Sequence, residues 1–245
     1  GLMAAIENER PLEGRTALVT GSSKGIGAAT AKALAAAGAH VILTGRDVRA
    51  LEAVEDAIHE LGGASTIAPV DLAEPDGIAR LASAIAGRWD TLDVMVIAAA
   101  YLPTLTPVTQ IDAKQFGQAI TTNILATQAL LAAFDPLLKR ADAGKVIGLT
   151  SSVGETPRAY WSAYASTKAA FDNLLESYAQ EVEKVSKLRV AIVDPGATRT
   201  SMRAKAYPGE DPKTVKEPAV VAERILELVV NGYESGHRER VAEPG

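Results

Sequence analysis

One stretch near the start of the chain decides the fold: Leu18-Val19-Thr20-Gly21-Ser22-Ser23-Lys24-Gly25-Ile26-Gly27. It joins a short β-branched, apolar run to an alanine-rich segment with helical spacing, so a strand is expected to turn directly into a helix. Its glycines follow the spacing G-x-x-x-G-x-G. Gly21 permits a tight turn, and the N–H groups at a helix start favour a diphosphate. The stretch predicts a dinucleotide-binding turn; a plain strand–helix turn with incidental glycines is the alternative.

Short apolar runs alternate with longer segments of helical spacing along the rest of the chain. The runs show no polar alternation, which is typical of strands covered on both faces of a parallel sheet. This order predicts a doubly wound, mostly parallel α/β sheet with helices on both faces, strand order 3-2-1-4-5-6 and a possible short seventh strand. The expected strands are residues 16–20, 41–44, 66–70, 94–98, 145–150 and 189–194. The expected helices are residues 25–38, 48–61, 78–88, 113–140, 164–185 and 219–230.

The 245 residues are expected to form a single domain, because no linker or internal repeat divides the chain. Residues 1–13 are expected to be an N-terminal arm. Residues 195–218, with several prolines and many charges, are expected to form a substrate loop.

Composition excludes several classes of protein and site. A hydrophobic fraction of 47% excludes a disordered chain, and the absence of cysteine excludes a disulfide scaffold and a cysteine nucleophile. The net charge of −5 argues against a nucleic-acid partner. No apolar run reaches the roughly 18 residues of a membrane span, and the first ten residues do not resemble a signal peptide. Because neither a membrane span nor a signal peptide is recognised, we expect a cytoplasmic protein. The three histidines show no metal-ligand spacing, so we expect no metal.

The end of the second expected strand bears on the choice of dinucleotide. It reads Leu43-Thr44-Gly45-Arg46, with Arg46 where an acid would contact the ribose of NAD. Arg46 and Lys24 both offer cations that suit a 2′-phosphate, whereas Asp47 nearby favours NAD. We therefore favour NADP(H) over NAD(H); a solvated surface arginine is the alternative for Arg46 alone.

Tyr164 and Lys168 are spaced i and i+4 in a segment expected to be helical, so both side chains lie on one face. An ammonium close to a phenol favours the phenolate, and such a tyrosine can exchange a proton with an alcohol oxygen. A pair on a helix surface is the alternative. Thr150-Ser151-Ser152 ends the fifth expected strand, where open α/β sheets bind ligands and where a serine hydroxyl can polarise a carbonyl.

Taken together, these motifs resemble those of the short-chain dehydrogenase/reductase family, including members like 3-oxoacyl-acyl carrier protein reductases. The resemblance covers the chain from Arg15 to about Val241. It is carried by Thr20-Gly21-x-x-x-Gly25-Ile26-Gly27, Asp71-Leu72, Asn123, Thr150-Ser151-Ser152, Tyr164-x-x-x-Lys168 and Asp194-Pro195-Gly196-x-Thr198-x-Thr200.

The resemblance implies roles for individual residues. Tyr164 would be the catalytic acid/base, and Lys168 would hold the nicotinamide ribose and lower the tyrosine pKa. Asn123 would support a water in a proton relay. Ser151 would polarise the carbonyl, with Ser152 as the alternative. The implied cofactor-binding residues are Gly21, Ser23, Lys24, Gly25, Ile26, Gly27, Arg46, Asp71, Leu72, Ala98, Ala99, Tyr164, Lys168, Pro195, Gly196, Thr198 and Thr200.

One segment departs from the family pattern: Ile97-Ala98-Ala99-Ala100 stands where the family usually has Asn-Asn-Ala-Gly. An asparagine there would cross-link neighbouring strands, and Ala98 cannot. Two functions follow as hypotheses. The first is an NADP(H)-dependent oxidoreductase acting on a small carbonyl compound or secondary alcohol; the second is a non-catalytic dinucleotide sensor. An epimerase or dehydratase is disfavoured by the short chain after Asp194. The family also implies a homodimer or homotetramer.

Overall fold

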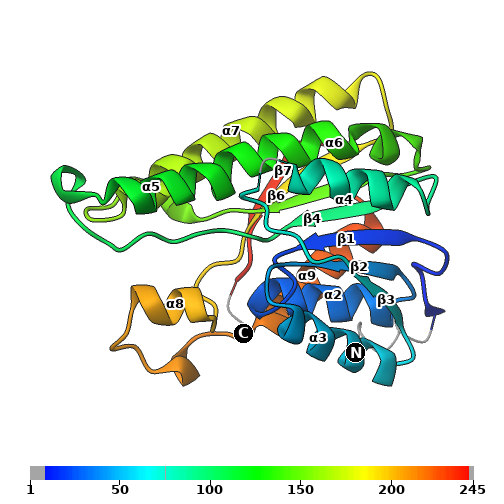
Figure 1. Ribbon diagram of the computed structural model, residues 1–245, viewed down its shortest axis with the longest axis horizontal. Helices are drawn as coiled ribbons and strands as arrows, with labels where there is room; N and C mark the ends of the chain where they lie inside the picture. Colours follow the sequence, from blue (N-terminus) through cyan, green and yellow to red (C-terminus); the bar gives the residue numbers. More distant parts are fainter. Residues whose placement is uncertain (1–8, 75, 243–245) are drawn as a thin grey trace.

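The computed structural model describes residues 9–74 and 76–242, and its centre is a parallel sheet (Figure 1). The strand order is β3-β2-β1-β4-β5-β6-β7, and each neighbouring pair is parallel. The strands are β1 (Thr16–Thr20), β2 (His40–Thr44), β3 (Ala64–Ile67), β4 (Val94–Ile97), β5 (Lys145–Leu149), β6 (Arg189–Asp194) and β7 (His237–Arg240). The predicted order and the short seventh strand are confirmed. All carboxyl ends therefore meet at one edge of the sheet.

Helices cover both faces of this sheet (Figure 1). One layer contains α4 (Gly77–Ala86), α5 (Ala113–Ala119), α6 (Ala126–Arg140) and α7 (Ser162–Glu183). The other contains α2 (Gly25–Ala36), α3 (Val48–Glu60) and α9 (Pro218–Asn231). A short helix, α8 (Ser201–Ala206), lies beyond the carboxyl edge of the sheet. No helix in the described part of the chain is long and apolar enough to cross a membrane.

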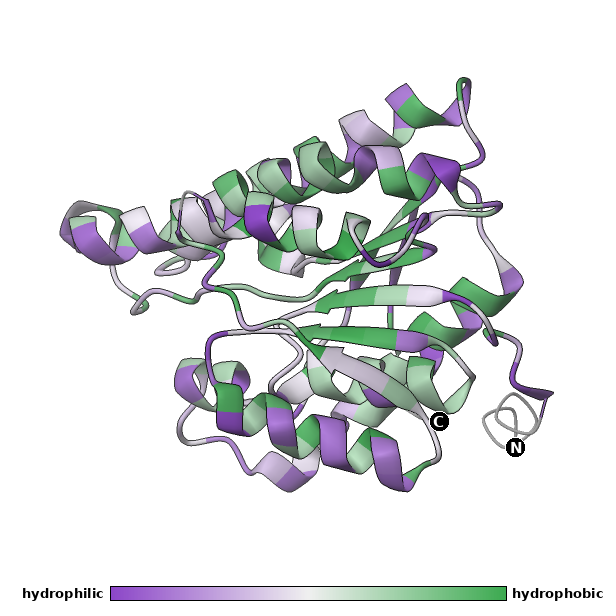
Figure 2. Cartoon of the chain, turned by 45° about the vertical axis from the view of Figure 1, so that its right-hand side comes forward, coloured by the Kyte–Doolittle hydropathy of each residue, from purple (hydrophilic) through white to green (hydrophobic). Residues whose placement is uncertain are grey.

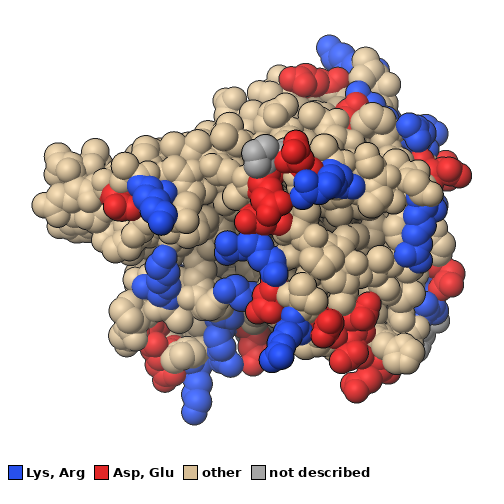
Figure 3. Space-filling view, in the orientation of Figure 1, with Lys and Arg blue, Asp and Glu red and all other residues tan. Residues whose placement is uncertain are grey.

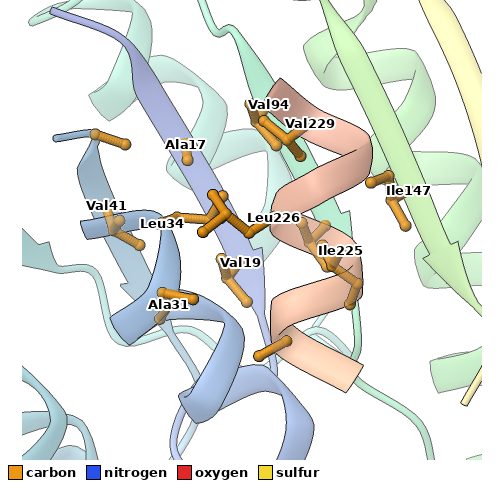
Figure 4. Close-up of a cluster of buried hydrophobic side chains, with 14 of the residues drawn as sticks. Ala17, Val19, Ala31, Leu34, Val41, Val94, Ile147, Ile225, Leu226 and Val229 are labelled. Carbon is orange, nitrogen blue, oxygen red and sulfur yellow. The ribbon is translucent and has the colours of Figure 1, made fainter. Parts of the chain in front are cut away.

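Successive residues of each central strand enter different cores, which explains the continuous apolar runs. In β1, Ala17 and Val19 join the core beneath α2 and α9, whereas Leu18 joins the core beneath α6 and α7. All three residues are fully buried. Figure 4 shows Val19 facing Leu226 of α9. Burial on both faces removes apolar surface from water and fixes the register of the sheet.

The helices follow the spacing and capping signals of the sequence. In α3, Leu51, Val54 and Ile58 form the buried face, at spacings of three and four residues. The Asp47 side chain accepts a 3.1 Å hydrogen bond from the N–H of Ala50 and so caps the helix. Figure 2 shows the hydrophilic residues of this helix on its outer face.

The structure corrects two expected elements. The third strand begins at Ala64 and ends at Ile67, rather than spanning residues 66–70, although the N–H groups of Ala68 and Val70 still donate to Leu43 O and Gly45 O at 2.8 and 3.1 Å. The single helix expected over residues 113–140 contains a π-helical segment, Ile120–Leu125, between α5 and α6. The other expected helices differ from the structure only at their ends.

The two remaining irregular segments are the N-terminal arm and the substrate loop. The first eight residues of the expected arm, 1–13, lie outside the described residues, but Leu12 is buried in the core and its N–H donates to Ala37 O at 2.8 Å. Residues 195–218 contain α8 and a 3₁₀ turn, Pro212–Thr214. The expected loop is therefore ordered by short helices rather than structureless.

Candidate active site

A cavity of about 700 Å³ opens at the carboxyl edge of the sheet. Figure 3 shows Lys and Arg side chains beside a hollow between the two layers of the molecule. Most of the cofactor-binding residues inferred from sequence line this cavity. They are Gly21, Ser23, Lys24, Gly25, Ile26, Gly27, Arg46, Asp71, Leu72, Ala98, Ala99, Tyr164, Lys168, Pro195 and Thr200. The fold thus brings together residues that are up to 179 positions apart in the chain, from Gly21 to Thr200.

Five of the predicted site residues are not in the cavity wall: Asn123, Ser151, Ser152, Gly196 and Thr198. Gly196 forms a turn at φ +66°, and its N–H donates to the Asp194 carboxylate at 2.9 Å. The Thr198 hydroxyl donates to the carbonyl oxygens of residues 195 and 196. These two residues shape the turn that presents Pro195 and Thr200 to the cavity.

The glycine turn packs too closely for any side chain. A Cβ on Gly27 would lie 2.0 Å from Gly21 O, and a Cβ on Gly21 would lie 2.8 Å from Ala99 Cα. Gly21 and Gly25 also have φ values of +62° and +58°. The turn therefore lets α2 begin directly against the end of β1.

The first turn of α2 is open to an anion. Lys24 is the N-cap residue, but its side chain makes no capping hydrogen bond, and the first turn holds no acidic residue. The first N–H groups of a helix have no partner within the helix, and they carry partial positive charge. Because this twelve-residue helix starts at the cavity wall, its amino end can hold a phosphate group there.

Two cations belong to the cavity wall. Lys24 and Arg46 both line it, and neither forms an ion pair with another described residue. Asp47 caps α3 through its carboxylate. Asp71 also lines the cavity, and its carboxylate accepts a 2.9 Å hydrogen bond from the Ala73 N–H.

Thr20 joins the ends of β1 and β4 where Ala98 replaces the family's asparagine. Its hydroxyl oxygen accepts hydrogen bonds from the N–H groups of Ala98 and Ala99 at 3.0 and 3.2 Å. Thr20 is fully buried. The backbone at Ala98 is therefore fixed without an asparagine side chain. The side chain that joins the two strands comes from Thr20 of β1 and not from the residue after β4.

Tyr164 and Lys168 lie on one face of α7 and both line the cavity. They are 5% and 2% exposed. The Lys168 ammonium donates to Leu149 O at 2.9 Å and stands over the Phe171 ring. Burial lowers the pKa of Lys168 to about 8, opposed by the charge of Asp172. Burial, with Asp194 and Asp172, raises the pKa of Tyr164 above its ordinary value, whereas the resemblance implied a lowered pKa.

The serines lie in the turn that follows β5. Ser151 is the N-cap of the 3₁₀ turn Ser152–Gly154, and its side-chain oxygen accepts a long, 3.5 Å hydrogen bond from Val153 N–H. Gly154 packs directly against α7, because a Cβ there would lie 3.1 Å from the carbonyl carbon of Lys168. The serine-bearing turn and the Tyr164 helix are thus held against each other.

Asn123 is 1% exposed and lies in the π-helical segment. Its side-chain amide donates to Tyr101 O and Thr167 Oγ1, both at 3.0 Å, and accepts from Tyr101 N–H at 2.9 Å. Through these hydrogen bonds, the Asn123 side chain links the loop after β4 to α7. π-helical turns often occur at functional sites because they displace a backbone carbonyl from the regular ladder.

Sequence reasoning missed one wall of the cavity. It is formed by Lys114, Gly117, Gln118, Thr121 and Thr122 of α5 and the π-helical segment. Polar residues at spacings of three and four were the available signal, but they read equally well as a solvated helix face. Tyr101 and Met202 also line the cavity. Met202 and Trp161 also pack against the small cluster containing Tyr164.

The family model described as short chain dehydrogenase matches residues 15–211. The uncharacterised oxidoreductase YciK of Escherichia coli K12 is 36% identical over 221 residues, which cover 89% of this chain and 87% of that protein.

Solved structures agree with this assignment. A short chain dehydrogenase from Shigella flexneri 2a, complexed with NADP, superposes with a TM-score of 0.90 at 34% identity, covering 95% of this chain and 99% of that one. One from Escherichia coli CFT073, complexed with NADPH, gives a TM-score of 0.90 at 34% identity, covering 96% and 99%. The fold, the matched residues and these relatives lead to one conclusion: this chain belongs to the short-chain dehydrogenase family of NAD(P)-dependent oxidoreductases.

Proposed function

We propose that this protein is an NADP(H)-dependent reductase that converts a small carbonyl compound to a secondary alcohol. The observation that carries the proposal is the position of Tyr164 and Lys168, buried side by side on α7 and facing the same cavity as the glycine turn. This supports the proposal, because a proton donor and the expected dinucleotide-binding turn share one cavity.

The cavity suits a dinucleotide that carries an additional phosphate. The open first turn of α2 can hold the diphosphate, and Gly21 leaves room for close backbone approach. Lys24 and Arg46 supply positive charge for a 2′-phosphate, and Asp47 is occupied as a helix cap. The NADP and NADPH of the two solved relatives support the same choice.

The residues of this chain would divide the work of the reaction. When bound, the nicotinamide supplies the hydride. Lys168 holds the adjoining ribose through its ammonium, and Tyr164 gives its phenolic proton to the substrate oxygen. Ser151 lies outside the cavity wall but directly follows Thr150, which lines it. Its hydroxyl oxygen accepts the long hydrogen bond from Val153 N–H, and its proton would polarise the carbonyl.

The protonated form of Tyr164 suits carbonyl reduction. The ordinary pKa of a phenol already lies well above neutral pH, and burial with two carboxylates raises it further. A protonated phenol serves as the acid of the reducing direction, whereas alcohol oxidation needs the phenolate. Tyr101 and Met202 in the cavity wall favour a substrate with an apolar group beside its carbonyl.

The substitution Tyr164→Phe tests this function. We expect it to lower turnover by at least about 10²-fold, because the proton donor is lost, while the thermal shift produced by NADPH stays intact. Turnover is measured as NADPH consumption with a panel of ketones. Tyr160→Phe is the matched control, since Tyr160 is 61% exposed and does not line the cavity.

Unchanged turnover in Tyr164→Phe would contradict the proposal. NADPH binding without consumption by any carbonyl compound in the panel would instead favour the dinucleotide sensor.

A further inference from the structure

A buried carboxylate lies behind Tyr164 and Lys168 and has no part in the chemistry above. Asp172 follows Lys168 by one turn of α7 and is 6% exposed. One of its oxygens accepts a hydrogen bond from the Thr150 hydroxyl, and the other accepts a 3.0 Å hydrogen bond from Arg238. Burying a carboxylate is costly unless its oxygens are paired. These two donors therefore allow the negative charge to remain beside the site.

The first donor connects Asp172 to the serine-bearing turn. Thr150 lines the cavity and directly precedes Ser151. Its backbone N–H donates to Val193 O at 2.9 Å, so its side chain is the part that links β5 to α7. Gly154, at the end of the same turn, packs against the backbone of Lys168. Asp172 and Gly154 thus hold the two ends of this turn against α7.

The second donor brings the last strand of the sheet into the same network. Arg238 lies on β7, and its guanidinium also contacts Glu155 at 3.0 Å and Glu176 at 3.3 Å. Glu155 immediately follows the 3₁₀ turn, and Glu176 lies one turn beyond Asp172 on α7. Arg238 therefore joins β7, the turn after β5 and α7.

The charges around Lys168 give Asp172 a second effect. Burial favours the neutral amine, and Asp172 opposes this by raising the pKa of Lys168. Other titratable groups belong to the same network: Asp194 of β6 and Asp172 both act on Tyr164 of α7, and Arg238 of β7 contacts Asp172 and Glu155. Among the causes that act on the pKa of Lys168, Asp172 alone favours the charged form.

We propose, resting on the function proposed above, that Asp172 is a positioning residue. It fixes the serine-bearing turn against α7 through Thr150 and holds a negative charge beside Lys168 that keeps the ammonium form. The hydrogen bond to Thr150 and the negative charge are separable tasks, and two substitutions separate them. Asp172→Asn removes the charge but keeps an oxygen that can accept from Thr150. Thr150→Val removes the hydroxyl but keeps the charge, which Arg238 still pairs.

The experiment follows Lys168 directly in the full chain. Lysine labelled with ¹³C at Cε is titrated by NMR, and the Lys168 signal is assigned by its loss in Lys168→Arg. We expect Asp172→Asn to lower the titration midpoint by about one pH unit or more and to shift the pH profile of NADPH consumption the same way. We expect Thr150→Val to leave the midpoint in place but to increase amide hydrogen exchange at residues 151–154. Thr150→Ser, which keeps a hydroxyl, should restore the wild-type exchange.

Glu176→Gln is the matched control, because Glu176 also contacts Arg238 but has a side chain that is 48% exposed. It should change neither readout. An unchanged Lys168 midpoint in folded Asp172→Asn, or unchanged exchange in Thr150→Val, overturns the proposal. If no variant, nor the unmodified protein, consumes NADPH, the proposed function fails, while titration and exchange still decide the role of Asp172.

Discussion

Arg46 is the residue on which we expect the choice of cofactor to depend. It is exposed at the cavity rim and forms no ion pair with another described residue, so its charge is available to a ligand. A hydrogen bond to a charged group contributes about 1.5–3 kcal/mol. We expect Arg46→Ala to raise the Kd of NADPH about 10- to 100-fold and to leave that of NADH nearly unchanged, measured by calorimetric titration. Arg49→Ala, an exposed arginine outside the cavity, is the control; an equal loss for both cofactors would refute a role at the 2′-phosphate.

Residue identity also marks where inference from the sequence succeeds and where it stops. The dinucleotide-binding turn could be predicted from the sequence because a positive φ and close packing both require glycine. The direction of the Tyr164 pKa shift does not follow from the sequence, because it depends first on burial of the phenol and then on the charges of Asp194 and Asp172, which only the fold brings together. The hydrogen bond of Thr150 to Asp172 likewise joins positions 22 residues apart.

At the scale of the element, the contact between α2 and β1 depends on Gly27. A methyl group there would lie 2.0 Å from Gly21 O, so helix and strand would have to separate. We expect Gly27→Ala to lower the free energy of unfolding by about 1–3 kcal/mol, as overpacking does, and to abolish the thermal shift with NADPH. Gly117→Ala in α5 is the control for stability, because nothing lies within 4 Å of its added Cβ; it should stabilise by about 0.5–1 kcal/mol. Equal urea midpoints for the two variants would refute the packing argument.

Element types were predicted well because helical spacing and buried apolar runs are local signals. The π-helical segment was not, since an Ile-Thr-Thr-Asn-Ile-Leu sequence fits a regular helix equally well. What distinguishes it is tertiary: Asn123 bonds with the loop after β4 and with Thr167 of α7. The strand β3 was misplaced for a related reason, since its edge position weakens the burial pattern.

For the whole molecule, buried titratable groups predict how stability depends on pH. Lys168 has its pKa lowered to about 8, so above that pH the folded chain has lost a proton that the unfolded chain still binds. The free energy of unfolding should therefore rise with pH from about 8 to about 10. Tyr164, Tyr178 and Tyr233 have raised pKa values, so unfolded phenols ionise first and stability should fall above about pH 10.

Urea denaturation across this range measures both limbs. Lys168→Met should flatten the rise, apart from the contribution of Lys145, whose pKa burial also lowers, and leave the alkaline fall. If the free energy of unfolding of Lys168→Met rises with pH as steeply as that of the unmodified protein, groups other than Lys168 cause the rise.

The contact between Arg238 and Asp172 has a consequence for the order in which the protein can be made. Asp172 is synthesised 66 residues before Arg238, whose guanidinium donates a hydrogen bond to its carboxylate. Chains emerge from the ribosome amino end first and begin to fold as they appear. A nascent chain that has completed β6 but not β7 thus lacks one of the two donors to this anion, and maturation of the site waits for translation of the final strand.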